Sequence, residues 1–248
     1  MTLQINWTIF FTLTALGIFG TIAIIPYSGA LQSGVEVTPK MRILGIVQGI
    51  VLVGVSVFVG MLASKSLGLR IGTPLQSMPL PALMGIAAGA VIMLIEILIF
   101  TPHLPEALTS SAAGVNLPLW KRFLAGFYGG ITEELLMRFF LLSGLLWLVT
   151  RFWHTASGGP VFAAFFIVNV VVAVIFGLGH LPATKMITAI TPLLVVRAIV
   201  LNSVAGIAFG WIYWRYGLAA AMVSHFCADM VLHVLSPVIS KAAGLAAA

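Results

Sequence analysis

Two adjacent glutamates, Glu133 and Glu134, lie within a long apolar segment of the chain. A charged side chain at the centre of a bilayer costs roughly 3 kcal/mol on insertion scales, so such residues persist where function or pairing offsets that cost. On a helix, Glu134 and Arg138 are four residues apart and can form an ion pair on one face. Glu133 points about 100° away from Glu134 and has no such partner on its own helix. An unpaired carboxylate in a low-dielectric site can act as a general base or as a metal ligand.

Partners for Glu133 must come from other helices, and three residues qualify. His180 ends an apolar segment in which two glycines allow neighbouring helices to approach closely. His225 and Asp229 are four residues apart on one face of the last apolar segment, and His233 continues that stripe one turn later. Glu133, His180, His225 and Asp229 can together enclose one water molecule or one divalent ion. Two histidines with carboxylates suit zinc or another transition metal.

Each of these features also has a structural interpretation. A single membrane histidine such as His180 is commonly an interhelical hydrogen-bonding group, and Glu134 with Arg138 forms a structural pair even in a functional site. Glu96, near the end of its segment, is expected to extend to the interface or to pair with a basic side chain. Arg197 is expected to anchor its segment at the interface, with a place on the cavity wall as the alternative. The combination across three segments is rarer than any part of it and favours function.

The composition assigns these residues to a membrane protein. Of the 248 residues, 61% are hydrophobic and 7% are charged, against about 25% charged in an ordinary soluble domain. The twelve Lys and Arg are scattered in ones and twos, which argues against a nucleic-acid partner. The single cysteine, Cys227, excludes an intrachain disulfide. We expect an integral membrane protein, and the compact chain without targeting signals favours a bacterial inner membrane.

The hydropathy pattern predicts an all-α, polytopic bundle of about seven membrane-spanning helices. A span needs about 20 apolar residues, and seven segments reach this length, approximately 5–27, 43–63, 80–100, 123–149, 161–181, 193–214 and 218–239. Residues 157–160 (Ser-Gly-Gly-Pro) form a strong helix breaker. The link 215–217 is so short that the last two spans should form an antiparallel hairpin.

The fourth segment is too long for one straight crossing. Residues 119–150 would form a helix of about 48 Å, against an apolar bilayer core of about 30 Å. Either this helix tilts strongly, or its first part lies in the interface and the chain bends at the glycine pair 129–130. Trp120, Lys121 and Arg122 are suitable interface anchors, which favours the second arrangement.

Three short motifs, each within an apolar segment, follow one another along the chain: Glu133-Glu134-x-x-x-Arg138, Phe176-x-x-x-His180 and His225-x-x-x-Asp229. Their order and spacing resemble the CPBP family, the CAAX-protease and bacteriocin-processing (Abi) intramembrane proteases. The best-known branch of that family is the type II CAAX prenyl endopeptidases. The resemblance covers residues 120–236 and predicts a protease core over 119–239, preceded by spans and a loop over 1–118 and followed by a tail over 240–248.

The resemblance implies an intramembrane endopeptidase that acts on a peptide or protein substrate at the membrane, with prenylated CAAX peptides as the best-known substrates of the family. Glu133 would activate the water with help from His180. His225 and Asp229 would stabilise the oxyanion or bind a metal, and the ion pair of the first motif would hold its helix in place. All of these steps need a positioned base and a preorganised site for negative charge.

Two mechanisms are open on the sequence alone. In a metalloprotease, Glu133, His180, His225 and Asp229 would bind Zn²⁺ or another divalent ion, which lowers the pKa of its bound water. In a glutamate protease without a cofactor, His225 would donate to the oxyanion and Asp229 would orient it.

Two other functions fit the same residues. A non-catalytic membrane scaffold, such as a bacteriocin-immunity protein, could use these helices to bind a partner. A small proton-coupled transporter could use the buried carboxylates and histidines as a relay, but it predicts inverted repeats, which the sequence does not show.

Overall fold

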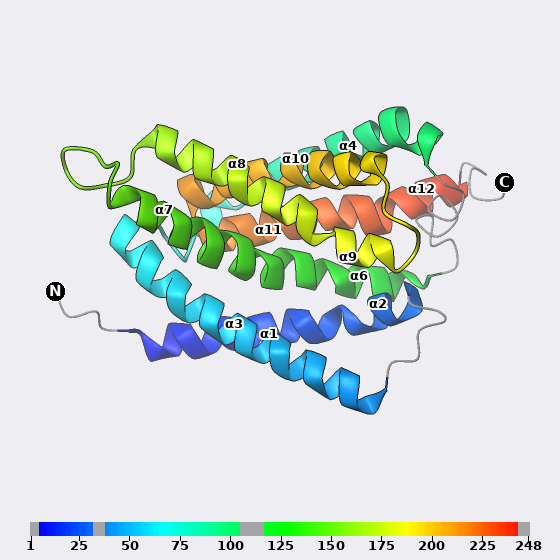
Figure 1. Ribbon diagram of the computed structural model, residues 1–248, viewed down its shortest axis with the longest axis horizontal. Coiled ribbons are helices and arrows are strands. Elements are labelled where there is room, and N and C mark those ends of the chain that lie inside the picture. The colour runs from blue at the N-terminus through cyan, green and yellow to red at the C-terminus, as the bar shows by residue number, and fades with distance from the viewer. Residues whose placement is uncertain (1–4, 32–37, 105–116, 243–248) are drawn as a thin grey trace.

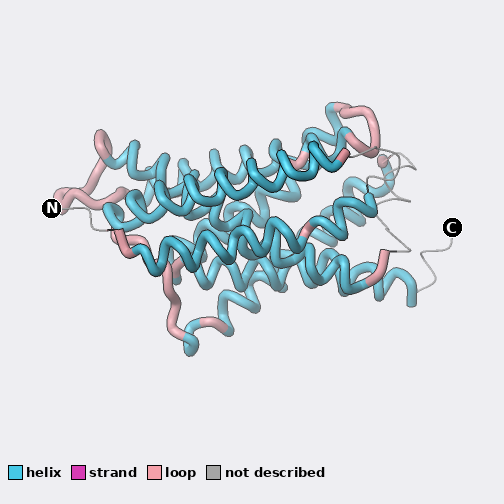
Figure 2. The backbone as a smooth tube through the Cα atoms, turned by 90° about the horizontal axis from the view of Figure 1, so that it is seen from below, coloured by secondary structure: helices cyan, strands magenta, loops and turns pink. Residues whose placement is uncertain are grey.

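The computed structural model describes residues 5–31, 38–104 and 117–242, and nearly all of them are helical. The helices lie side by side along the long axis of the molecule (Figure 1). Most of the connecting loops lie at the two ends of the helices (Figure 2). A helix satisfies its backbone hydrogen bonds within the segment, which is why apolar segments fold this way in lipid. The predicted all-α bundle is confirmed. The predicted tail lies outside the described residues beyond position 242.

The helical elements named below are, in chain order, α1 (Trp7–Ala23), α2 (Ile25–Leu31), α3 (Pro39–Leu67), α4 (Pro79–Ile95), η2 (Glu96–Phe100), α6 (Leu119–Phe127), η4 (Tyr128–Glu133), η5 (Leu135–Leu142), α7 (Ser143–Thr150), α8 (Phe162–Gly179), α9 (Leu181–Lys185), α10 (Pro192–Tyr216), α11 (Leu218–Asp229), η6 (Met230–Leu235) and α12 (Ser236–Ala242). Four of them, η2, η4, η5 and η6, are π-helical turns inserted in longer helices. Such turns occur frequently at functional sites.

Within the described residues, six helices are long and apolar enough to cross a membrane: Trp7–Ala30, Ile43–Leu67, Leu75–His103, Phe162–Lys185, Pro192–Tyr216 and Leu218–Ile239. They match six of the seven predicted spans to within a few residues. The predicted fourth span is absent from this set because three charged residues of the first motif lie within it. Six spans are therefore supported by length and composition, and the fourth segment differs from them in its charge content.

That fourth segment is a continuous helical rod through the middle of the bundle, built from α6, η4, η5 and α7 (Figure 1). The chain stays helical through the glycine pair 129–130, in the wider π-helical form, where a bend was expected. Arg122 is also not the interface anchor that was expected. It is only 3% exposed, and its guanidinium donates to the carbonyl oxygens of Leu117 and His233 at 3.4 Å each. Arg122 is buried because this end of the rod packs against η6.

Glycines set how closely the other helices approach one another. A Cβ at Gly85 of α4 would collide with the carbonyl oxygen of Ser224 on α11, so only glycine permits this contact. α10 and α11 form the predicted antiparallel hairpin through Gly217, whose φ of 108° favours glycine. The Leu218 amide donates to the carbonyl of Arg70 at 3.0 Å, which fixes the start of α11. These contacts hold α11 and its histidine beside the rod.

Candidate active site

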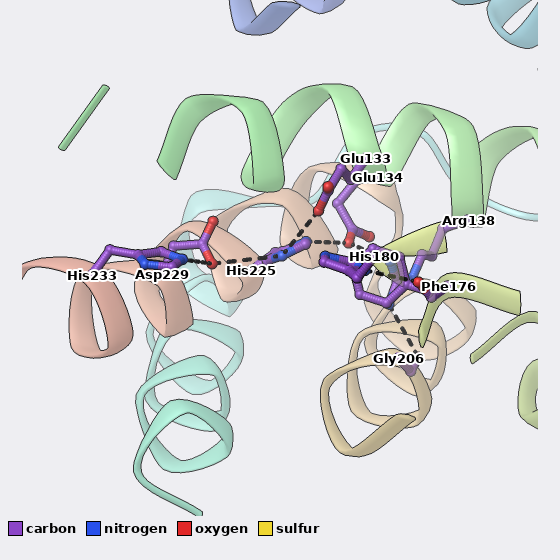
Figure 3. Close-up of polar contacts among 9 residues, drawn as sticks. All are labelled: Glu133, Glu134, Arg138, Phe176, His180, Gly206, His225, Asp229 and His233. Atoms are coloured by element: carbon purple, nitrogen blue, oxygen red, sulfur yellow. Dashed lines mark hydrogen bonds and ion pairs between the residues drawn. The ribbon is translucent and has the colours of Figure 1, made fainter. Parts of the chain in front are cut away.

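The two adjacent glutamates have different surroundings, as their positions on the helix predicted. Glu134 is completely buried, and its Oε1 lies 2.8 Å from Arg138 Nη1. The same oxygen lies 2.7 Å from Nδ1 of His225 on α11. Glu133 instead lines the central cavity with its side chain 18% exposed, and its Oε2 lies 3.7 Å from His225 Nε2 (Figure 3). One glutamate is thus fixed by partners while the other faces the cavity.

His225 is oriented by Glu134 and not by Asp229, which sequence reasoning had assigned to that role. An ionised carboxylate only accepts hydrogen bonds, so Nδ1 of His225 must carry the proton that it shares with Glu134. Its Nε2 consequently faces Glu133 and Asp229, and Asp229 Oδ1 lies 3.8 Å from it. The same carboxylate oxygen lies 3.9 Å from Nε2 of His233, one turn later. Asp229 therefore lies beside Nε2 of His225, the ring nitrogen that is not bonded to Glu134.

His180 reaches the cavity from the end of α8. Its Nδ1 donates to the carbonyl oxygen of Phe176, one turn earlier, at 2.8 Å. In a neutral ring this bond leaves Nε2 as an acceptor. The Phe176 ring meets both imidazoles edge-on, with centroid distances of 4.8 Å to His180 and 6.0 Å to His225. The second motif thus fixes the tautomer of His180 and links it to the first and third motifs.

Arg138 is buried between two aromatic rings. Its guanidinium carbon lies 5.1 Å from the Phe176 centroid and 5.4 Å from the Phe209 centroid, and Nη2 donates to the carbonyl of Gly206 at 3.3 Å. Phe209 also stacks on His225, with the centroids 4.6 Å apart and the planes at 28°. Cation–π contacts are strongest where water is excluded. Arg138 therefore ties the rod to α8 and α10 as well as to Glu134.

Gly129 allows the rod to approach Asp229. A Cβ at this position would collide with Oδ2 of Asp229 and would lie 3.1 Å from Nε2 of His225. The glycine lies in the π-helical turn η4, four residues before Glu133. Sequence reasoning missed this role, and it also missed Phe209. The glycine pair in an apolar segment was the available signal for Gly129, whereas no motif pointed to Phe209.

These side chains line one cavity of about 600 Å³. Glu133, His180, His225 and Asp229 all contribute to its wall, so the structure brings together the four residues that the sequence predicted to enclose a water molecule or a metal ion. Most of the remaining wall is apolar and comes from α4, α8, α9, α10 and the C-terminal part of α11 with η6. An apolar cavity with a few convergent polar groups is the usual form of a small-molecule or peptide site.

The same four residues do not form a metal site as they are arranged. Across the described ranges, no group of three or more His, Cys, Asp or Glu side chains is placed to hold a metal ion. The Nδ1 atoms of His180 and His225 donate to Phe176 and Glu134, as the second ring nitrogen of a metal-binding histidine commonly does, so the two Nε2 atoms are the nitrogens available to a ligand. The spacing of the four side chains, and not the orientation of the imidazole rings, is what falls short of a metal site in this arrangement.

A protein-family model matches part of the chain. Residues 115–231 match this model, which is described as type II CAAX prenyl endopeptidase Rce1-like. Over this segment the chain is similar to the Rce1-like family. It contains all three motifs, so the resemblance to the CPBP intramembrane proteases is confirmed. No curated protein and no solved structure matches the chain. The match supports an intramembrane endopeptidase of the CAAX type at the level of the family, and the six long apolar helices support an integral membrane protein.

Proposed function

We propose that the protein hydrolyses a peptide bond of a membrane-associated, prenylated CAAX-type protein with a water molecule that Glu133 activates. The observation that carries this proposal is the contrast between the two glutamates. Glu134 is buried and bonded to Arg138 and His225, whereas Glu133 opens onto the cavity. A general base must reach the water that it deprotonates, and only Glu133 of the pair can do so. The bacterial inner membrane is the proposed location.

In the proposed reaction, the water lies between the carboxylate of Glu133 and Nε2 of His180. Glu133 takes one proton from the water as its oxygen bonds to the scissile carbonyl carbon. Glu133 then gives that proton to the amine that leaves, so no further reactant is needed. His180 holds the water through its acceptor nitrogen, as its bond to Phe176 requires.

The negative charge on the carbonyl oxygen is stabilised by His225 in this proposal. His225 carries protons on both nitrogens, and Nδ1–H donates to Glu134 while Nε2–H donates to the developing oxyanion. Oδ1 of Asp229 lies 3.8 Å from this nitrogen when no substrate is bound. Fixed donors of this kind are effective because they need no reorganisation during the reaction. Glu134 and Arg138 position His225 and do not touch the substrate.

The test uses the purified protein in liposomes with a quenched CAAX peptide, in farnesylated and unmodified forms. We expect cleavage of the farnesylated peptide that persists after dialysis against a chelator, with no stoichiometric metal by elemental analysis. Activity that is lost on chelation and restored by Zn²⁺ would contradict a mechanism in which Glu133 activates the water without a metal ion. Absence of cleavage of both peptides would contradict the proposed function. The variant His154→Gln, in an exposed loop, is the matched control for His180→Gln, which we expect to lose activity.

A further inference from the structure

A second charged pair lies in the wall of the same cavity. Arg197 of α10 donates to Glu96, at the start of η2, through Nε at 3.0 Å and 2.8 Å and through Nη2 at 2.7 Å. The two side chains are 22% and 21% exposed. Arg197 is therefore not an interface anchor; it lines the cavity together with Glu133 and His225. The protease mechanism described above gives this pair no part.

Arg197 retains hydrogen-bonding capacity on its second edge. A guanidinium has five N–H donors in a planar fork, which matches a carboxylate two bonds at a time. Glu96 occupies the edge formed by Nε and Nη2. Among the described residues, Nη1 has no acceptor, so the edge formed by Nη1 and Nη2 can bind a second carboxylate. Glu96 holds the guanidinium plane in place for that contact.

The charges in the cavity are arranged along its length. Of the described residues that line it, Arg197 is the one Lys or Arg and is paired with Glu96, while Glu133 and Asp229 lie beside His225. Phe209, which stacks on His225, is twelve residues after Arg197 on α10, and this separation is about 18 Å along the helix. An anionic group entering the cavity is repelled at Glu133, whereas at the Arg197–Glu96 pair, whose charges cancel, it can accept hydrogen bonds from the remaining N–H groups of Arg197.

The spacing on α4 agrees with that on α10. Gly85 contacts Ser224, the neighbour of His225, and Glu96 lies eleven residues after Gly85, which is about 16 Å along the helix. An extended peptide advances about 3.3–3.6 Å per residue. Because the side chains of Arg197 and Glu133 reach inward from the two ends, roughly three to five residues would bridge them.

We propose that Arg197, held by Glu96, binds the free C-terminal carboxylate of the substrate. The substrate then lies with its C terminus at the Arg197 end and its scissile bond at Glu133, and a short C-terminal segment is released. This inference rests on the proposed function and adds a specificity site to it. The ligand class is an α-carboxylate at the end of a peptide, and an amide end removes both its charge and half of its acceptors.

The test compares two farnesylated peptides that are identical except for a C-terminal carboxylate or carboxamide. Hydrogen bonds to charged groups predict that the wild type favours the carboxylate by about 10-fold to 100-fold in kcat/KM, mainly through KM. The Arg197→Gln variant should cleave both peptides with the lower kcat/KM that the wild type shows for the carboxamide peptide. Arg215→Gln removes an exposed arginine at the other end of α10 and should keep the full preference.

Arg197→Gln leaves Glu96 without its cation, so the double variant Glu96→Gln/Arg197→Gln provides a second, uncharged pair. It should also lack the preference while keeping the unfolding temperature of the wild type. Equal cleavage of both peptides by the wild type would overturn the carboxylate site and leave the protease proposal standing. A preference that survives in both Arg197 variants would also overturn it. If the wild type cleaves neither peptide, the proposed function itself fails.

Discussion

Gly129→Ala should reduce catalysis without unfolding the protein. The new Cβ would collide with Oδ2 of Asp229 and would lie 3.1 Å from Nε2 of His225. The carboxylate is the end of a side chain, so it can rotate away while the backbone stays in place. A misplacement of about 1 Å at a reacting group costs up to about 100-fold in rate, and we expect kcat to fall by about 10-fold to 100-fold. Alanine favours a helix over glycine by about 1 kcal/mol, which offsets the strain.

The assay measures kcat and KM on the farnesylated peptide together with the thermal unfolding temperature in the same detergent. Gly144→Ala is the control, since a Cβ at that position of the same rod meets nothing within 4 Å. The expected result is a loss of kcat for Gly129→Ala with an unfolding temperature like that of the control. Wild-type kcat, or a fall in unfolding temperature in step with activity, would refute the proposed fit between the rod and Asp229.

Three further predictions concern residues around the site. Arg138→Ala should lower the free energy of unfolding by about 3–5 kcal/mol, because the buried Glu134 then loses the guanidinium of its ion pair; chemical unfolding in detergent measures this, and an unchanged midpoint would contradict it. Phe209→Leu should lower kcat by about 10-fold, since the ring stacked on His225 is lost while the volume is nearly kept; unchanged kinetics would show that the stacking is irrelevant. Gly217→Ala should lower the free energy of unfolding by about 1–3 kcal/mol, because alanine is strained at the φ of 108° that Gly217 adopts. An unfolding temperature equal to that of the wild type would refute this.

The sequence predicted the features that depend on one helix at a time. Helical spacing was enough to pair Glu134 with Arg138 and to leave Glu133 free, and both features are present in the structure. Six of the seven predicted spans also match within a few residues, because a sufficiently long uncharged apolar segment can be recognised from the sequence. The hairpin at Gly217 followed from a link too short for any other arrangement.

Features that depend on how two helices are rotated against each other were not predictable. The bond between His225 and Glu134 joins residues 91 positions apart and requires α11 to present its histidine to the buried face of the rod. The pair of Glu96 with Arg197 spans 101 positions. Arg122 was assigned to the interface from its residue type, but the packing of α6 against η6 buries it. The spacing of residues along a helix shows which of them share a face, but it does not show which other helix that face contacts.

The most direct test of the account is the cleavage rate of Glu133→Gln, an isosteric change that removes only the base. Loss of a general base typically costs about 10²–10⁴-fold, and we expect kcat to fall within that range. The unfolding temperature should stay at the wild-type value, because Glu133 faces the cavity and does not hold the helices together. A Glu133→Gln protein that is folded and retains kcat within about threefold of the wild type would contradict the assignment of Glu133 as the base.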